Sequence, residues 1–263
     1  MKIIKIPSSQ GGLGKANGAE KAPDEIVRQL EKINLSEGGL KPVFEAAEAE
    51  VVQGNIESTN DNIYESAKKE LKENQSVVFL GGDHSVSFPI LKAFSELNRN
   101  PGLIMFDAHA DCANNFEPAT HEDFIRVIVE KDMIKPENIV LVGLRNIHSI
   151  ELKFLRDNRI KCYTMKEISY EGINAVCDAV MAAAKDWGAL HVSVDIDVVD
   201  PAFAPGTGYC EPSGLTSREL VYFLQRIKLL RNLKSADLTE VNPEKDTNEM
   251  TSKLGAKIIA ELL

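Results

Sequence analysis

Residues 103–111 read LIMFDAHAD, an apolar run followed by polar side chains at every second position. The apolar part predicts a β-strand. Asp107, His109 and Asp111 stand at i, i+2 and i+4, so in an extended backbone their side chains project to one side. The segment therefore predicts three candidate metal ligands at the carboxyl end of a strand.

Two further segments place the same kinds of side chain after apolar runs. Asp195 and Asp197 follow the run 190–194, and His84 follows the run 76–80. In an open parallel sheet the loops at the carboxyl ends of the strands lie along one edge, so we expect the three segments to converge. The result is a predicted cluster of two imidazoles and four carboxylates.

Short β-rich runs alternate with longer helix-period runs along most of the chain, which is typical of βαβ units and a parallel sheet. The sequence therefore predicts the α/β class and a single domain over residues 1–263, since no linker, repeat or like-charge block divides it. Thr216 and Glu219 have the spacing of a capping box and predict a helix start. The predicted strands span residues 2–6, 76–80, 102–106, 138–142, 160–164, 189–195 and 233–238, and the predicted helices span residues 23–33, 61–73, 87–97, 121–131, 150–157, 173–186, 217–228 and 248–262.

Composition restricts the class of partner. Lys and Arg total 30 against 40 Asp and Glu, a formal net charge of −10, which argues against nucleic acid or an anionic membrane and favours a cationic ligand. No apolar run reaches the about 18 residues of a membrane span, and the first is too short for a signal peptide. Four cysteines without a C-x-x-C spacing predict reduced thiols and a cytoplasmic protein. Gly12 and Gly14 make no dinucleotide-binding loop, because Asn17 stands at the third glycine position.

The predicted cluster of ligands requires a cation. Six imidazole and carboxylate groups held close together repel unless something neutralises them, and four negative charges match two divalent ions. An oxygen-rich set with two histidines and no required thiolate favours Mn²⁺. Two such ions about 3.5–4 Å apart lower the pKa of a shared water toward neutrality, which predicts a hydrolase. Asp83, beside His84, is expected to orient the loop or a metal ligand rather than to bind metal itself.

The chain contains, in order, GGDHS at 81–85, DAHAD at 107–111, SVDIDVVDP at 193–201, PGTG at 205–208 with GLT at 214–216, and EVNP at 240–243. These motifs resemble those of the ureohydrolases, the family of arginase, agmatinase and their relatives. The resemblance implies a three-layer α/β/α arginase-like fold with a mainly parallel eight-stranded sheet. It also implies two Mn²⁺ ions per chain, hydrolysis of a small cationic guanidino substrate to urea and an amine, and a homo-oligomer of trimeric or hexameric form.

The resemblance implies a role for each site residue. Asp111 would take the proton of the attacking metal-bridging hydroxide, and Glu240 would hold the guanidinium, since planar charge pairing suits that contact. His121 would protonate the leaving amine, because histidine titrates near the working pH. A surface position for Glu240 and a helix N-terminus for His121 stay open as alternatives. The implied metal ligands are His84, Asp107, Asp111 and Asp197 for one ion or for both, completed by His109 and Asp195 for the other.

Three positions at the expected mouth of the site depart from arginase. Ala113 stands where an asparagine-like contact is expected, His148 where an acidic group would meet an α-ammonium, and Tyr209 where relatives carry threonine. His148 and Tyr209 are therefore expected to contact the substrate tail. These changes favour agmatine or another decarboxylated guanidine, with arginase, guanidino-acid hydrolase and formimidoylglutamase activities as alternatives. Cys112 and Cys210 are also expected at the mouth, as functional thiols or as inert small residues.

Other classes explain the pattern less well. A metallophosphatase also uses Asp-x-His and two metals, but the Gly-Asn-His-Asp/Glu element it needs is absent from the sequence. A metal-binding homologue without catalytic activity would be expected to lose ligands, and all six are present. A histone-deacetylase-like amidohydrolase uses one metal, whereas His84 and the second Asp-x-Asp provide for two.

Overall fold

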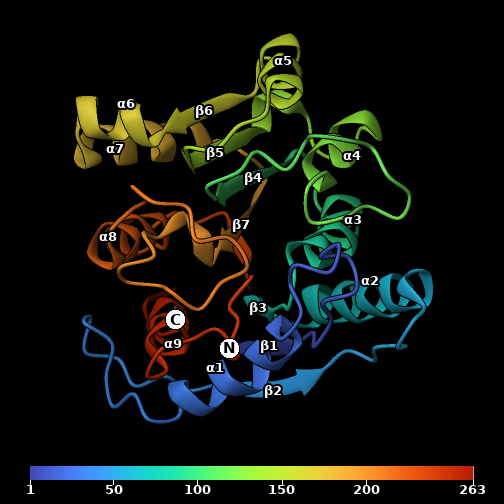
Figure 1. Ribbon diagram of the computed structural model, residues 1–263, viewed down its shortest axis with the longest axis vertical. Helices are drawn as coiled ribbons and strands as arrows, with labels where there is room; N and C mark the ends of the chain where they lie inside the picture. The colour runs from blue at the N-terminus through green and yellow to red at the C-terminus, as the bar shows by residue number, and fades with distance from the viewer. Residues whose placement is uncertain (263) are drawn as a thin grey trace.

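The computed structural model describes residues 1–262, which form a sheet of eight parallel strands with helices on both sides (Figure 1). The strand order is β2-β1-β3-β8-β7-β4-β5-β6. The strands are β1 Lys2–Lys5, β2 Glu45–Glu48, β3 Val77–Leu80, β4 Pro101–Phe106, β5 Ile139–Leu144, β6 Lys161–Thr164, β7 Ala189–Asp195 and β8 Leu233–Thr239. The α-helices are α1 Ala22–Leu30, α2 Ile56–Glu73, α3 Ser87–Leu97, α4 Phe124–Glu130, α5 Ser149–Asp157, α6 Met165–Glu171, α7 Ile173–Ala184, α8 Ser217–Ile227 and α9 Met250–Leu262.

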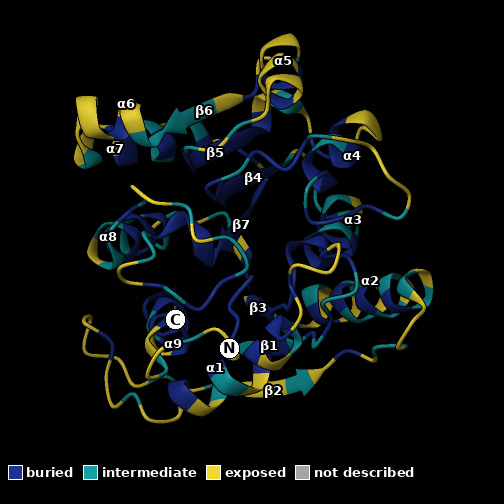
Figure 2. Cartoon of the chain, viewed as in Figure 1, coloured by how far each residue is buried: buried dark blue, intermediate teal, exposed yellow. Residues whose placement is uncertain are grey.

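Helices cover both faces of the sheet, which gives three layers. Helices α1, α7, α8 and α9 pack on one face, toward which Ile104 and Phe106 of β4 point. Helices α2 to α5 pack on the other face, where Leu103 and Met105 of the same strand lie. Successive side chains of a strand alternate between faces, so one apolar run serves both layers. Figure 2 shows the buried strands inside helices whose outer faces are exposed.

The predicted α/β class and the seven predicted strands are confirmed, with strand ends within two residues. The sequence does not predict β2, because Glu45-Ala-Ala-Glu48 has no apolar run and lies largely exposed at the edge of the sheet. The short helix α6 is also not predicted. Helix α2 begins at Ile56 rather than at residue 61, because Asn55 caps it by accepting a hydrogen bond from the Ser58 amide. The capping box at the start of α8 is confirmed.

The sheet order brings four strands that are distant in sequence to the centre of the molecule. Strands β3, β8, β7 and β4 are consecutive neighbours, and each is followed by a loop that carries polar residues of the predicted site. His84 follows β3, Glu240 follows β8, Asp195 ends β7, and the segment 107–111 follows β4. The parallel order therefore places all four loops at one edge of the sheet.

None of the helices within residues 1–262 combines the length and apolar character needed to cross a bilayer.

The loop that carries His84 packs closely on the backbone of an N-terminal segment. The Asp83 amide donates a hydrogen bond to the Ser8 carbonyl at 3.0 Å. A Cβ atom added to Gly82 would lie 2.1 Å from that same carbonyl oxygen. Only glycine permits this approach, because the neighbouring atom belongs to the backbone and has little freedom to move.

Replacing Gly82 with alanine is therefore expected to lower the free energy of unfolding by about 2–3 kcal/mol, as an overpacked core does. Urea unfolding of the Gly82→Ala variant measures this loss. Gly38→Ala is the matched control, because its nearest atom would be Ser36 Oγ at 3.7 Å, and it should unfold at nearly the wild-type denaturant concentration. Equal stability of the two variants would contradict the argument.

Candidate functional site

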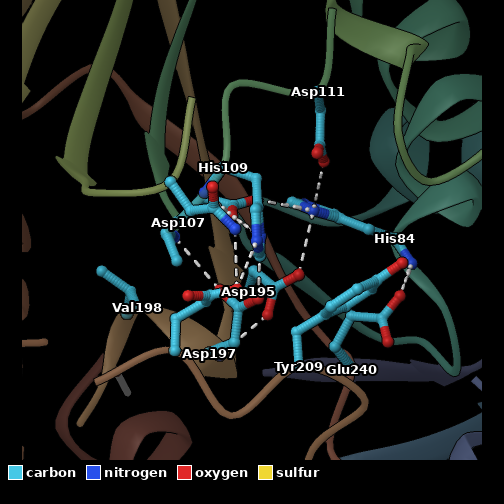
Figure 3. Close-up of polar contacts among 12 residues, drawn as sticks. His84, Asp107, His109, Asp111, Asp195, Asp197, Val198, Tyr209 and Glu240 are labelled. Atoms are coloured by element: carbon cyan, nitrogen blue, oxygen red, sulfur yellow. Dashed lines mark hydrogen bonds and ion pairs between the residues drawn. The ribbon is translucent and has the colours of Figure 1, made fainter. Parts of the chain in front are cut away.

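The first group of candidate ligands is built around His84, beyond the carboxyl ends of the central strands (Figure 3). His84 Nδ1 is 3.1 Å from Asp107 Oδ2 and 3.0 Å from Asp111 Oδ2. It is also 3.4 Å from Asp195 Oδ2. All four side chains are buried. The ligand atoms that His84, Asp107 and Asp111 offer lie within 4.8 Å of one another, a grouping that can hold a metal ion.

A second group shares one residue with the first. His109 Nδ1 is 3.0 Å from Asp197 Oδ2 and 3.5 Å from Asp107 Oδ1. These three residues also offer ligand atoms within 4.8 Å of one another. The two carboxylate oxygens of Asp107 therefore face different histidines. The six residues predicted as ligands are thus brought together as two adjoining groups joined at Asp107.

In the first group Asp107 Oδ2 and Asp111 Oδ2 lie 3.0–3.1 Å from His84 Nδ1, yet none of these three buried ligand atoms makes a hydrogen bond of acceptable geometry within residues 1–262. An unpaired buried polar atom costs about 1–3 kcal/mol, and native proteins contain few of them. A cation among these three atoms would satisfy all of them at once. Carboxylate oxygen with imidazole nitrogen is a donor set for Mn²⁺ and similar divalent ions, so the residues fit such a group.

Backbone amides hold the carboxylates in place. Asp195 accepts a hydrogen bond from the Asp197 amide at 2.8 Å, and Asp197 accepts one from the Ala108 amide at 3.1 Å. Asp107 accepts a bond from the His109 amide at 2.6 Å. Asp195 and Asp197 each use one oxygen for support, which leaves the other free to point into the cluster. In Asp107 the supported oxygen, Oδ1, also faces the His109 ring.

Two residues shape the loops in other ways. Asp83 accepts hydrogen bonds from the Gly11 amide at 3.0 Å and the Ser85 amide at 2.8 Å, which confirms that it orients the loop. Asp111 has a φ of 48°, in the left-handed region that costs free energy for a residue other than glycine. Such strain persists only where the surroundings enforce it, and here it turns the carboxylate toward His84.

The cluster has perturbed pKa values because it is buried and because its charges are close together. Burial raises the pKa of Asp111 to about 8, and the charge of Asp107 acts in the same direction. Burial followed by the charge of Asp197 raises the pKa of Asp195 well above its ordinary value. Burial alone would lower the pKa of His109, but the adjacent carboxylates raise it to about 12. Without a metal, bound protons therefore neutralise the negative charge that a divalent cation would otherwise neutralise.

Glu240 and His121 form a second polar pair beside the ligand cluster. Glu240 Oε1 is 2.9 Å from His121 Nδ1 and accepts a hydrogen bond from the His84 amide at 3.0 Å. Burial alone would lower the pKa of His121, but this carboxylate raises it to about 9. Glu240 Oε2 and His121 Nε2 are buried without a partner in the described part of the chain. Glu240 also has a left-handed φ of 61°.

The structure decides between the alternatives left open for Glu240, a surface position, and for His121, a helix N-terminus. Glu240 is 3% exposed, so it is not a surface residue. Helix α4 begins only at Phe124, so His121 lies in the turn before the helix and not at its N-terminus. Both side chains line a cavity of about 340 Å³ that also reaches His109, Asp111, Asp195 and Asp197.

The outer wall of this cavity is formed by side chains from separate loops. The Tyr209 hydroxyl donates a hydrogen bond to Glu122 at 2.9 Å, and the Tyr209 ring lies 5.2 Å from the His109 ring, centroid to centroid. Lys15 Nζ lies 4.9 Å from the centre of the Tyr209 ring and 3.9 Å from Glu122. Sequence motifs give no signal for Lys15, because it stands in the glycine-containing N-terminal loop that matches no binding pattern.

The remaining predicted mouth residues fall into different places. Ala113 and His148 line the cavity. His148 also caps α5, accepting a hydrogen bond from the Ile150 amide at its Nδ1. The expectation that Cys112 lines the mouth is wrong, because Cys112 is 0% exposed and its amide donates to Glu151. Cys210 is exposed but lies outside the lining of the cavity.

The sequence profile of the arginase family matches residues 1–263. The chain belongs to the arginase family. An arginase-family structure, that of arginase from Bacillus subtilis, superposes with a TM-score of 0.90 at 27% identity, covering 100% of this chain and 97% of that one. The arginase-like α/β fold expected from the resemblance is therefore confirmed.

Arginase-family relatives with different names are about equally similar to the chain. The chain is 33% identical to the agmatinase of Bacillus subtilis, in an alignment that covers 94% of this chain and 80% of the agmatinase. It is also 33% identical to the formimidoylglutamase of Halalkalibacterium halodurans, over 80% of its length and 66% of the relative's. Membership of the arginase family therefore identifies a hydrolase of the ureohydrolase type and leaves the substrate to be inferred from the cavity.

The perturbed pKa values predict that the metal-free protein loses stability as the pH rises. Asp111 has a pKa of about 8 in the folded protein against an ordinary 3.8, and His121 has about 9 against 6.5. Between pH 5 and pH 8 the folded state thus holds more protons than the unfolded chain, so the free energy of unfolding falls as the pH rises. Urea unfolding in the presence of EDTA should show a fall of several kcal/mol over this range, because one pKa unit corresponds to about 1.4 kcal/mol.

The Asp111→Asn variant is the control for this titration, because an amide of similar shape cannot ionise. Its stability should depend less on pH than that of the wild type. A metal-free wild type with constant stability between pH 5 and pH 8 would refute the expectation.

Proposed function

We propose that residues 1–263 form one ureohydrolase domain that binds two Mn²⁺ ions and cleaves a guanidino C–N bond, giving urea and an amine. The observation that carries the proposal is the set of unpaired buried atoms in the ligand cluster and in the adjoining pair of Glu240 and His121. Three of them, on His84, Asp107 and Asp111, suit a metal, and the two others, on Glu240 and His121, suit a substrate. We also propose a cytoplasmic homo-oligomer, trimeric or hexameric, as the family resemblance implies.

Each polar residue of the cavity has one task in this mechanism. The residues that would hold the ions are His84, Asp107, His109, Asp111, Asp195 and Asp197. When bound, the ions would lower the pKa of water and supply hydroxide near neutral pH. The free Oε2 of Glu240 binds the planar guanidinium and holds its carbon beside the metal ligands. Asp111 accepts the proton of the attacking oxygen. His121 donates a proton from Nε2 to the leaving nitrogen as the C–N bond breaks.

The mouth favours a substrate without an α-amino-acid group. Ala113 offers no side-chain hydrogen bond to an α-carboxylate, and His148 offers no anion to an α-ammonium. Glu122, at 38% side-chain exposure, can instead meet the terminal ammonium of agmatine. Agmatine is therefore the first candidate substrate, and L-arginine and formimidoylglutamate rank behind it.

One observation favours a second candidate. Lys15 is the only lysine or arginine among the residues that line the described cavity, and its ammonium approaches Glu122 no closer than 3.9 Å. A carboxylate at the end of a guanidino acid, such as guanidinobutyrate, would pair with Lys15. The two candidates differ in the sign of the tail charge, so Glu122 and Lys15 can be tested against each other.

The first test concerns the metal. Elemental analysis after loading with Mn²⁺ and gel filtration should give close to two ions per chain. Asp195→Ala and His109→Ala should each lower the metal content and urea release together, because each removes a ligand. Asp200→Asn replaces a half-buried carboxylate that is not one of the six ligands, keeps its shape, and should keep both ions. A fully active protein with one ion or none would refute the two-metal site.

The second test concerns the substrate. Urea release should show a higher kcat/KM for agmatine or a guanidino acid than for L-arginine, by about tenfold or more, because Ala113 and His148 do not provide the hydrogen bond and the anion that an α-amino-acid group would need there. Glu122→Gln should lower kcat/KM for agmatine more than for guanidinobutyrate. Lys15→Met should lower kcat/KM for guanidinobutyrate more than for agmatine. L-arginine as the best substrate would overturn this assignment while leaving the reaction type intact.

A further inference from the structure

A ladder of polar side chains crosses the buried centre of the sheet between β7 and β8. His191 is the direct partner of Ser235 across the strands, and Ser193 is the partner of Asp237. His191 Nδ1 is 2.7 Å from Ser235 Oγ, and its Nε2 is 2.8 Å from Asp237 Oδ2. All four side chains are at most 2% exposed. Apolar residues would fill such a position at lower cost, so stability alone does not explain the ladder.

The ladder continues to His84. Ser193 donates its hydroxyl to Asp237 Oδ1 at 2.6 Å, and His84 Nε2 lies 2.8 Å from Ser193 Oγ. A serine hydroxyl has a single hydrogen. Because Asp237 receives that hydrogen, the oxygen of Ser193 must accept the bond from His84 Nε2–H. A neutral His84 ring therefore keeps its proton on Nε2 and leaves the Nδ1 lone pair free, on the side of Asp107 and Asp111.

The far end of the ladder is fixed as firmly as the near end. Asp237 Oδ2 also accepts a hydrogen bond from Ser87 of α3 at 3.0 Å. Burial alone would raise the pKa of Asp237, but the hydrogen bond and charge of His191 lower it, so the carboxylate stays ionised and accepts all its bonds. The Phe124 ring packs against the His84 ring at 4.6 Å between centroids and limits its rotation.

We propose that Ser193 and Asp237 are positioning residues that hold His84 in the tautomer and orientation a metal ion needs. The inference rests on His84 being a metal ligand, as proposed above. Histidine ligands generally donate their second N–H to a carboxylate or carbonyl, and loss of such a partner costs about 10–100-fold in metal affinity. In this chain a serine hydroxyl relays the contact to a carboxylate one strand away.

The test measures Mn²⁺ affinity directly, without substrate. Titration of the metal-free protein, with free Mn²⁺ followed by electron paramagnetic resonance, gives the dissociation constant of each site. Ser193→Ala should weaken one of the two sites about 10–100-fold and leave the other within about threefold. Ser252→Ala is the matched control, because it removes a buried serine hydroxyl that donates to Asp246 and is not part of the ladder. It should keep both affinities within about threefold.

Two further variants separate positioning from a general loss of structure. Ser193→Thr retains the hydroxyl and should restore an affinity within about threefold of the wild type. In a His84→Asn background, Ser193→Ala should have no further effect on affinity, because the residue through which it acts is gone. Urea unfolding in EDTA reports the stability of each variant, so a purely structural effect would appear there and not in the binding data.

The outcomes distinguish this inference from the proposed function. Wild-type protein that binds two Mn²⁺ ions, with Ser193→Ala binding them equally well, would overturn the positioning role alone. Equal losses of affinity in Ser193→Ala and Ser252→Ala, or additive effects in the double variant, would overturn it as well. Wild-type protein that binds no Mn²⁺ would overturn the metal centre and the positioning role together.

Discussion

The mutual repulsion of the buried carboxylates around Asp107 is the constraint on which the rest of the site depends. Asp107 Oδ2 faces His84 at 3.1 Å and Asp107 Oδ1 faces His109 at 3.5 Å, so one side chain belongs to both ligand groups. Such a cluster is stable only with added positive charge, from protons or from metal ions. The surrounding loops hold the carboxylates in place despite their repulsion. Asp111 adopts a left-handed φ, and one oxygen of Asp197 accepts a hydrogen bond from a backbone amide.

The sheet supplies the rigidity that the cluster needs. Its ligands come from the ends of three strands, and the partner of His121 comes from a fourth, yet β3, β8, β7 and β4 are consecutive in the sheet. Each strand is anchored by hydrogen bonds on both sides, so the loops begin from fixed points. The polar ladder of Ser193 and Asp237 extends this rigidity inward, because it connects His84 to two strands at once.

The sequence predicts the centre of this molecule better than its periphery. Apolar runs followed by Asp or His identify the central strands and the six candidate ligands, because burial and charge require those residue types there. The edge strand β2 is polar and exposed, so it carries no such pattern. The sequence does not predict the ladder. His191 and Ser193 alternate with apolar residues, a pattern typical of a strand with one face exposed to solvent, but every residue of this strand is buried. The prediction for Cys112 is wrong because the backbone turns at Asp111, where φ is 48°, and Cys112 is buried.

The same contrast explains how relatives with different names share one fold. The reactive end of the cavity is built from strand ends, whose positions are fixed by the sheet, and the arginase of Bacillus subtilis superposes at a TM-score of 0.90 despite 27% identity. The mouth is built from loops: Lys15, Glu122 and Tyr209 come from three of them, and their side chains contact one another. A change in these loops therefore alters the charge at the mouth of the cavity without disturbing the ligand cluster around Asp107.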